Sequence, residues 1–294
     1  MFERISNSWK LAMSSWRVLK TDKKLVLFPL VSGVALLLVL ASFAVPFALL
    51  ARNGWIDDVQ QNGVPVWVYA VTFLFYYCNY FVIVFFTSAL TSCALMRLNV
   101  DEPRLGDGFR MAFSRLPQIA AWALVAATVG MLLKMIESAH EKAGQIISAV
   151  LGTAWSIMTF FVVPVLVVEK VGPFAAISRS VAILKKAWGE SLVGTIGLGL
   201  LTFLLVLPGI ALLAGGVWLM FGAEMFAVGL VVIGVAVLYL IGVSLVTSAL
   251  QSIYLAAMYQ FAAHERVPQG FDREMLAGAF KAKPSGRVSD DRIM

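Results

Sequence analysis

The chain has 294 residues, of which 60% are hydrophobic and only 14% charged, and its formal net charge is +6. Soluble domains carry about 25% charged and about 45–50% apolar residues, so this composition excludes a protein whose whole surface faces water. The charges gather in short stretches between long apolar runs. This pattern predicts an all-α, polytopic transmembrane helical bundle with about six spans.

The first predicted span covers residues 25–50 and follows a basic N-terminal segment. A secretory signal has an apolar region of only about 7–15 residues, so the longer run favours a retained helix. In the segment before it, apolar side chains recur at helical spacing between basic ones, which predicts an amphipathic helix lying in the membrane interface. Its candidate ligands for lipid headgroups are Trp16, Arg17 and Lys20.

The second predicted span, residues 65–96, is long and contains a deep polar residue, Asn79. Thirty helical residues reach about 45 Å, more than the ~30 Å hydrocarbon core, so we expect this helix to tilt or to project into the cytoplasm. Tyr76 and Tyr80 add hydroxyl groups near Asn79. We expect Asn79 to form an interhelical hydrogen bond worth about 1 kcal/mol. The alternative is a polar contact in a lipid- or substrate-lined cavity.

A second, shorter amphipathic segment stops at Pro117 and offers Arg110 and Arg115 as candidates for binding headgroups. The third and fourth predicted spans follow at residues 117–136 and 146–168. Because the apolar runs are again close to the thickness of a bilayer, these two spans should form a transmembrane hairpin.

The third amphipathic segment runs from Phe174 to Trp188. Its apolar residues share one helical face, and its basic residues lie on other faces. Its headgroup candidates are Arg179, Lys185, Lys186 and Trp188. The fifth and sixth spans are predicted at residues 191–221 and 225–262, and a polar, partly disordered tail at 267–294 with a short helix over 272–280.

Three prolines, Pro46, Pro164 and Pro208, fall within or near the ends of different spans. Each removes a backbone hydrogen bond, so we expect kinks. The sequence Leu207-Pro208-Gly209 predicts a break inside the fifth span.

Lysine and arginine gather on one side of the predicted spans. That side holds 20 of the 23 basic residues, in segments 1–24, 97–116, 169–190 and the tail after 262. The other side receives only Arg52, Lys134 and Lys142. Basic residues mark the cytoplasmic side, so both termini are predicted to be cytoplasmic.

The sequence also contains an internal similarity. Ile5-Ser6-x-Ser8 with Trp16 matches Ile177-Ser178-x-Ser180 with Trp188 at an offset of 172, and Thr87-Ser88-Ala89-Leu90-x-Ser92 matches Thr247-Ser248-Ala249-Leu250-x-Ser252 at an offset of 160. We interpret the transmembrane domain, residues 1–266, as three units of about 1–100, 101–170 and 171–266, each an interfacial helix followed by a transmembrane hairpin. Chance similarity between apolar segments is the alternative.

One stretch carries a resemblance to known proteins. Its residues are Phe161 to Glu169, Gly172-Pro173, Ile177 to Ser180 and Lys185 to Gly189. It resembles a family of uncharacterised bacterial polytopic membrane proteins. More distantly, it is similar to the membrane domain attached to some glycerophosphodiester phosphodiesterases. The resemblance implies a six-span protein of the bacterial inner membrane, and it does not imply phosphodiesterase chemistry, because the chain carries no soluble catalytic domain.

No set of residues in the sequence points to catalysis, a cofactor or a metal. His140 and His264 fall on opposite sides of the membrane, and Cys78 and Cys93 are too far apart on one predicted helix to form a disulfide. We expect no enzyme and no cofactor. The predicted function is a non-catalytic membrane protein that binds or organises lipids, or other membrane proteins, through its basic interfacial helices. The alternative is a transporter or channel for a hydrophobic or lipid-like substrate.

The expected partners follow from the same charges. Basic residues next to predicted spans attract anionic lipid headgroups. A protein partner or a second copy of the chain are further candidates, whereas nucleic acid is not expected because the basic residues are scattered over four membrane-adjacent segments.

Overall fold

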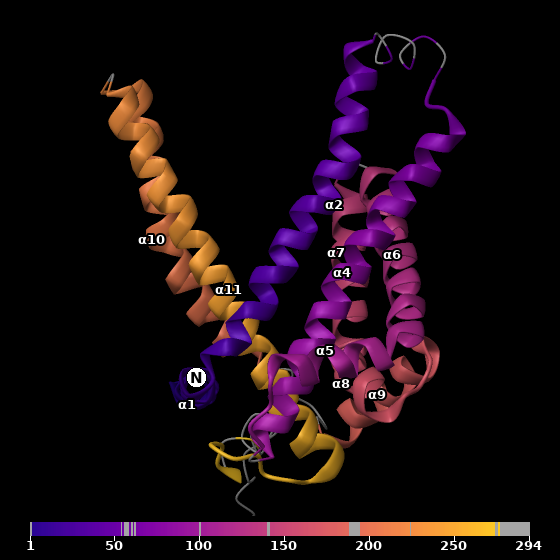
Figure 1. Ribbon diagram of the computed structural model, residues 1–294, viewed down its shortest axis with the longest axis vertical. Coiled ribbons are helices and arrows are strands. Elements are labelled where there is room, and N and C mark those ends of the chain that lie inside the picture. The colour runs from indigo at the N-terminus through magenta and orange to yellow at the C-terminus, as the bar shows by residue number, and fades with distance from the viewer. Residues whose placement is uncertain are drawn as a thin grey trace, which may run out of the picture.

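The computed structural model describes most of the chain. The described residues are 2–53, 55, 59, 61, 63–99, 101–139, 142–187, 195–223, 225–273 and 276, apart from the side chains of 2–9, 186–187, 195–198 and 200. All regular structure within these ranges is helical, which confirms the predicted all-α class (Figure 1). In chain order, the helices are α1 (Phe2–Thr21), the 3-10 helix η1 (Lys23–Val26), α2 (Leu27–Arg52), α4 (Val66–Leu98), α5 (Leu105–Ser114), α6 (Leu116–Ala139), α7 (Ala143–Met158), α8 (Val162–Glu169), α9 (Pro173–Ala187), α10 (Thr195–Phe221) and α11 (Phe226–His264).

Six segments in the described part of the chain are long and apolar enough to cross a membrane. They are Lys23–Arg52, Val66–Leu98, Leu116–Ala139, Ala143–Glu169, Leu201–Phe221 and Phe226–His264. Each coincides with one of the six predicted spans, so the chain is a multi-pass integral membrane protein.

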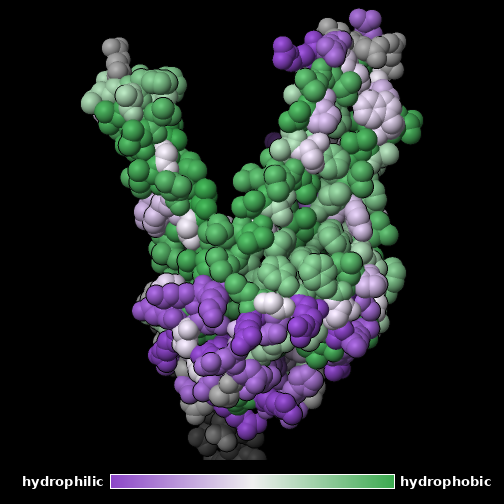
Figure 2. All heavy atoms as spheres, in the orientation of Figure 1, coloured by the Kyte–Doolittle hydropathy of each residue, from purple (hydrophilic) through white to green (hydrophobic). Residues whose placement is uncertain are grey.

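The spans form two arms that diverge from a common base. The hairpin of α10 and α11 is one arm, and α2, α4, α6 and α7 form the other (Figure 1). The space-filling view shows both arms covered by hydrophobic residues and separated by a V-shaped opening, whereas the base is hydrophilic (Figure 2). The short helices α1, α5, α8 and α9 lie in or beside the base (Figure 1).

The buried core lies near the base rather than in the arms. Helix α4 has 33 residues and α11 has 39, or about 50 Å and about 58 Å of helix, so both exceed the ~30 Å hydrocarbon core. Their buried residues concentrate in the lower ends, from Val84 to Leu98 and from Thr247 to Ala262. By contrast, the most apolar stretch of α2 contains no buried residue. The extra length of the two helices is therefore used to build the core.

The matching sequence segments lie in these two buried ends. Ser88 and Ala89 of α4 are fully buried, as is Ala249 of α11, and the two helices contact each other. Small side chains let helix backbones approach closely. Below this contact Gln260 donates from Nε2 to the carbonyl of Leu95 at 3.3 Å. The similarity thus falls on helix ends that meet in the core, and the threefold repeat itself stays a prediction.

The fourth span is interrupted, which the sequence interpretation missed. Helix α7 ends at Met158 and α8 begins at Val162. Pro164 occupies the first turn of α8, where a backbone N–H has no partner within the helix, so the proline breaks no helical bond. The interruption leaves the N–H of Phe161 free to donate to the hydroxyl of Ser180 on α9 at 3.0 Å. The break therefore joins the hairpin to the following amphipathic helix.

The predicted break at Pro208 is wrong, because α10 is continuous from Thr195 to Phe221 with Pro208 inside it. Pro46 likewise lies inside the continuous helix α2. A single missing backbone bond is tolerated in spanning helices when the rest of the ladder is intact. Gly209 has a packing role instead, since a Cβ added there would clash with Leu240 of α11.

The beginning of the polar tail packs against the base. The N–H of Gln269 donates to the carbonyl of Leu98 at 3.2 Å, and the side chains of Phe271 and Leu276 are buried in the core. Most of the helix predicted at 272–280, and the tail after it, lies outside the described residues. Residues 267–273 and Leu276 thus belong to the packed base rather than to a free tail.

Candidate functional site

Helix α1 presents predicted headgroup ligands at the edge of the base. Arg17 and Lys20 are exposed, and the Lys20 ammonium lies 5.7 Å from the centroid of the Trp16 ring. The opposite face of α1 is buried through Leu11, among others. This division follows from the helical spacing of apolar residues and leaves the cations available to solvent or lipid.

The two predicted arginines of the second amphipathic segment differ in their surroundings. Arg110 on α5 is exposed. Arg115 is buried, and its Nε donates to the carbonyl of Val167 at 2.9 Å, while Nη1 donates to the hydroxyl of Ser114 at 3.3 Å. Burial lowers the pKa of Arg115 below its usual value. Arg115 therefore ties the α5–α6 junction to α8, and its Nε and Nη1 atoms are already engaged within the protein.

On α9, Arg179 pairs with the carboxylate that ends α8. Its Nε lies 2.9 Å and 3.1 Å from the two oxygens of Glu169. The hydroxyl of Tyr259 on α11 donates to the same carboxylate at 3.1 Å. The hydrogen bond to Glu169 raises the pKa of Arg179. This cluster links three helices at the base.

Of the other headgroup candidates on this segment, the structure describes the side chain of only one. Lys185 is exposed on α9. The side chain of Lys186 and the whole of Trp188 lie outside the described part of the chain.

The polar residues predicted inside the second span do not form the expected interhelical bond. Asn79 donates from Nδ2 to the carbonyl of Phe75, four residues earlier on α4, at 2.7 Å. The amide thus donates within its own helix instead of to a neighbouring one, so the interhelical prediction is wrong. Tyr76 packs edge-on against Phe75 with ring centroids 6.1 Å apart. The Tyr80 hydroxyl lies against Gly130 of α6, only 2.8 Å from where a Cβ would sit there.

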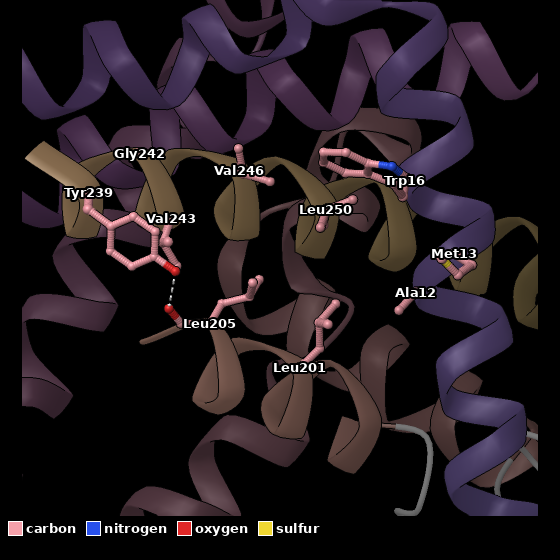
Figure 3. A pocket seen from close by; sticks show the side chains of 10 residues that line it. All are labelled: Ala12, Met13, Trp16, Leu201, Leu205, Tyr239, Gly242, Val243, Val246 and Leu250. Atoms are coloured by element: carbon pink, nitrogen blue, oxygen red, sulfur yellow. Dashed lines mark hydrogen bonds between the residues drawn. The ribbon is translucent and has the colours of Figure 1, made fainter. Parts of the chain in front are cut away.

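A cavity of about 570 Å³ opens between α1 and the α10–α11 hairpin (Figure 3). Its volume falls within the ~300–1,000 Å³ typical of ligand sites. Helix α1 forms one end of the cavity and Tyr239 the other (Figure 3). The lining residues are Ala12, Met13, Trp16, Leu201, Leu205, Tyr239, Gly242, Val243, Val246 and Leu250.

The lining of the cavity is almost wholly apolar. The Tyr239 hydroxyl donates to the carbonyl of Leu205 across the hairpin at 2.8 Å, and is therefore engaged (Figure 3). Most other lining side chains are aliphatic. Burying an unpaired polar group costs free energy, so this cavity suits an aliphatic ligand and disfavours a polar one.

Two cations of α1 lie one helical turn beyond side chains that line this cavity. Met13 and Trp16 line it, and Lys20 follows Trp16 by one helical turn, as Arg17 follows Met13. The site therefore joins an apolar cavity to a basic rim on a single helix. Within the part of the chain that the structure describes, no group of three or more His, Cys, Asp or Glu residues could hold a metal.

Most of the chain matches a known protein family. The family described as "Family of unknown function (DUF6159)" matches residues 66–270. The chain belongs to this family. No curated protein and no solved structure matches. Membership of an uncharacterised family is thus confirmed, and the more distant similarity to glycerophosphodiester phosphodiesterases stays a prediction.

The sequence indicated residues of α1 beside the cavity as candidate ligands for lipid headgroups, but it indicated none of the cavity walls. Trp16, Arg17 and Lys20 stand out because they combine aromatic and basic side chains at helical spacing. Leu201 and Val243 line the cavity, yet they look like any other aliphatic residues of a spanning helix. Helix α1 packs against a hairpin that is far away in the sequence. A contact of this kind produces no local sequence pattern from which it could be predicted.

Proposed function

We propose that this protein is a non-catalytic protein of the bacterial inner membrane that binds and organises anionic lipids. Its short amphipathic helices act at the cytoplasmic leaflet, with both termini in the cytoplasm. The proposal rests on one observation, the combination of exposed cations and exposed large apolar side chains on α1, α5 and α9.

Each of these helices carries the pair of features that interfacial binding needs. Met13 on α1 is 43% exposed, Phe113 on α5 is 62% exposed and Phe174 on α9 is 76% exposed. Exposed cations accompany them, namely Arg17, Lys20, Arg110 and Lys185. An apolar side chain inserts at the boundary of the acyl chains while the cation meets the headgroup. Near an anionic surface each such cation contributes about 1 kcal/mol.

The orientation agrees with the distribution of charge over the whole chain. The hydrophilic base contains the segments richest in lysine and arginine (Figure 2). Anionic lipids give the cytoplasmic leaflet a negative surface potential, which attracts such segments. The same bias orients membrane proteins during insertion.

The packed base favours binding over conduction. Fully buried side chains from different helices fill it, including Phe28, Leu90 and Tyr259. A transporter or channel needs a path across both leaflets, and the opening between the arms meets this core at the base (Figure 2). Flux and lipid-scrambling assays on proteoliposomes address this alternative, since transport would require movement of solute or lipid that empty vesicles do not show.

The proposal is tested by the lipid preference of the purified protein. The basic-end variant is Arg17→Gln, Lys20→Gln, Arg110→Gln and Lys185→Gln, and the control is Arg52→Gln with Lys142→Gln at the opposite end. In exchange experiments with nanodiscs of phosphatidylglycerol and phosphatidylcholine, the wild type and the control should be enriched in phosphatidylglycerol. The basic-end variant should lose most of that enrichment. An equal preference for both lipids in the wild type would refute the proposal.

A further inference from the structure

We propose that the cavity between α1 and the α10–α11 hairpin holds one acyl chain of an anionic phospholipid, whose phosphate is bound by Arg17 and Lys20. This inference rests on the proposed function and names its ligand and its site. Three observations carry it: the lining, the length of the cavity and the charge at its rim.

The lining selects an aliphatic ligand. Leu201, Leu205 and Val246 present hydrocarbon to the cavity, and the hydroxyl of Tyr239 is engaged with the carbonyl of Leu205. A polar ligand would lose its hydrogen bonds to water and find few replacements here. An acyl chain has no such bonds to lose and contributes favourably with each buried methylene.

The length of the cavity fits one leaflet. Its α11 wall runs from Tyr239 to Leu250, which is about 16 Å of helix. One leaflet is about half of the ~30 Å hydrocarbon core. A lipid chain that enters beside α1, extended as it is in a bilayer, is therefore long enough to reach the far end of the cavity.

The rim supplies charge complementarity to a phosphate. Lys20 lies over the Trp16 ring, and Arg17 and Lys20 are both exposed. Tryptophan favours the headgroup level of a membrane, where its ring meets hydrocarbon and its N–H meets water. A phospholipid places its phosphate at this same level. One molecule can therefore contact the cations with its phosphate and the apolar cavity with its acyl chain.

The hairpin that forms the far wall is closely packed. A Cβ added to Gly216 would lie 2.6 Å from Cγ1 of Ile233, and one added to Gly229 would lie 2.6 Å from the carbonyl oxygen of Gly216. Such contacts hold α10 and α11 together as a unit. The cavity is lined by other residues of α10 and α11 together with α1, so the bound chain fills space that protein side chains leave open (Figure 3).

The experiment uses native mass spectrometry of the full-length protein in mild detergent. The cavity-filling variant is Val243→Trp with Val246→Trp. The matched control is Val235→Trp with Leu238→Trp on the same helix, at residues that are 53% and 71% exposed and do not line the cavity. Phosphatidylglycerol and phosphatidylcholine with identical chains are added as probes.

The wild type and the control should retain one phosphatidylglycerol molecule in preference to phosphatidylcholine. Filling the cavity should reduce this retention by about tenfold or more, since losing even two buried methylenes has that effect. Retention of the lipid by the filled variant would overturn the inference, and the proposed function would stand if the basic-end variant still lost its preference. Equal retention of the two lipids by the wild type would overturn both.

A second measurement does not depend on folding of the filled variant. Wild-type protein is irradiated with phosphatidylglycerol that carries a diazirine near the end of one chain. We expect adducts concentrated in the segment from Tyr239 to Val246. Adducts spread evenly over the exposed faces of α2 and α11 would contradict the cavity as the binding site.

Discussion

Arg115 shows how a predicted surface residue acts inside the protein. It follows α5 and donates to the carbonyl of Val167, near the end of α8. The last four carbonyls of a helix have no partner within it, and a cation there also interacts favourably with the helix dipole. Arg115 thus serves as a C-terminal cap supplied from another segment.

Replacing Arg115 should therefore destabilise the base. Arg115→Met removes the donor and leaves a buried carbonyl unpaired, which costs about 1–3 kcal/mol. Thermal unfolding in detergent measures the loss as a lower Tm. Arg110→Met, at an exposed position on α5, is the matched control and should leave the Tm unchanged. Equal effects of the two substitutions would contradict the capping role.

The cluster of Glu169, Arg179 and Tyr259 permits a test of coupling between helices. Side chains of Arg179 and Glu169 are 44% and 23% exposed, so solvent screening limits the ion pair to the order of 1 kcal/mol. Tyr259→Phe and Glu169→Ala should each lower stability modestly. Because both substitutions remove the hydrogen bond from Tyr259 to Glu169, the double variant should lose less than the combined single losses. Additive losses in a double-mutant cycle would show that the two groups act independently.

At the scale of elements, the α10–α11 hairpin depends on glycines at specific positions. A Cβ on Gly216 would meet Ile233 and the carbonyl of Gly229, whereas nothing lies within 4 Å of one on the neighbouring Gly215. Both residues are glycines of α10, and they differ only in what surrounds them. The same substitution at each position therefore gives a matched pair of variants.

Gly216→Ala should force the helices apart and lower the free energy of unfolding by about 1–3 kcal/mol, as overpacking does. Gly215→Ala should be neutral or slightly stabilising, because alanine favours the helix over glycine. Unfolding of both variants in the same detergent gives the comparison. A destabilised Gly215 variant would mean that helix packing is not the reason.

The helices could be predicted from the sequence more completely than the contacts between them. The spans and amphipathic helices follow from the length and period of apolar runs, so all six spans were found. The interruption at Thr159–Phe161 was missed because it is stabilised by Ser180, a tertiary partner. Asn79 was expected to bond across helices, but it donates to the carbonyl of Phe75 on its own helix. The cavity was missed because its walls come from segments far apart in sequence.

For the whole molecule, the orientation gives a prediction that involves no lipid measurement. Reporters fused after Arg52 and Ala139 should be active outside the cytoplasm, and one fused after Ala187 should be active inside it, because the basic segments stay on the cytoplasmic side. Activity is read from a pair of reporters that work on opposite sides of the membrane. A cytoplasmic signal after Ala139 would invalidate the six-span topology.

The divergence of the two arms has a consequence for the bilayer itself. The leaflet next to the base meets a broad protein cross-section, whereas the distant leaflet meets two separate arms, the α10–α11 hairpin and the arm of α2, α4, α6 and α7 (Figures 1 and 2). The molecule therefore displaces unequal areas of lipid from the two monolayers. Such a wedge favours membranes that bulge toward the side of the base, and local accumulation of many copies would bend the surface in that direction.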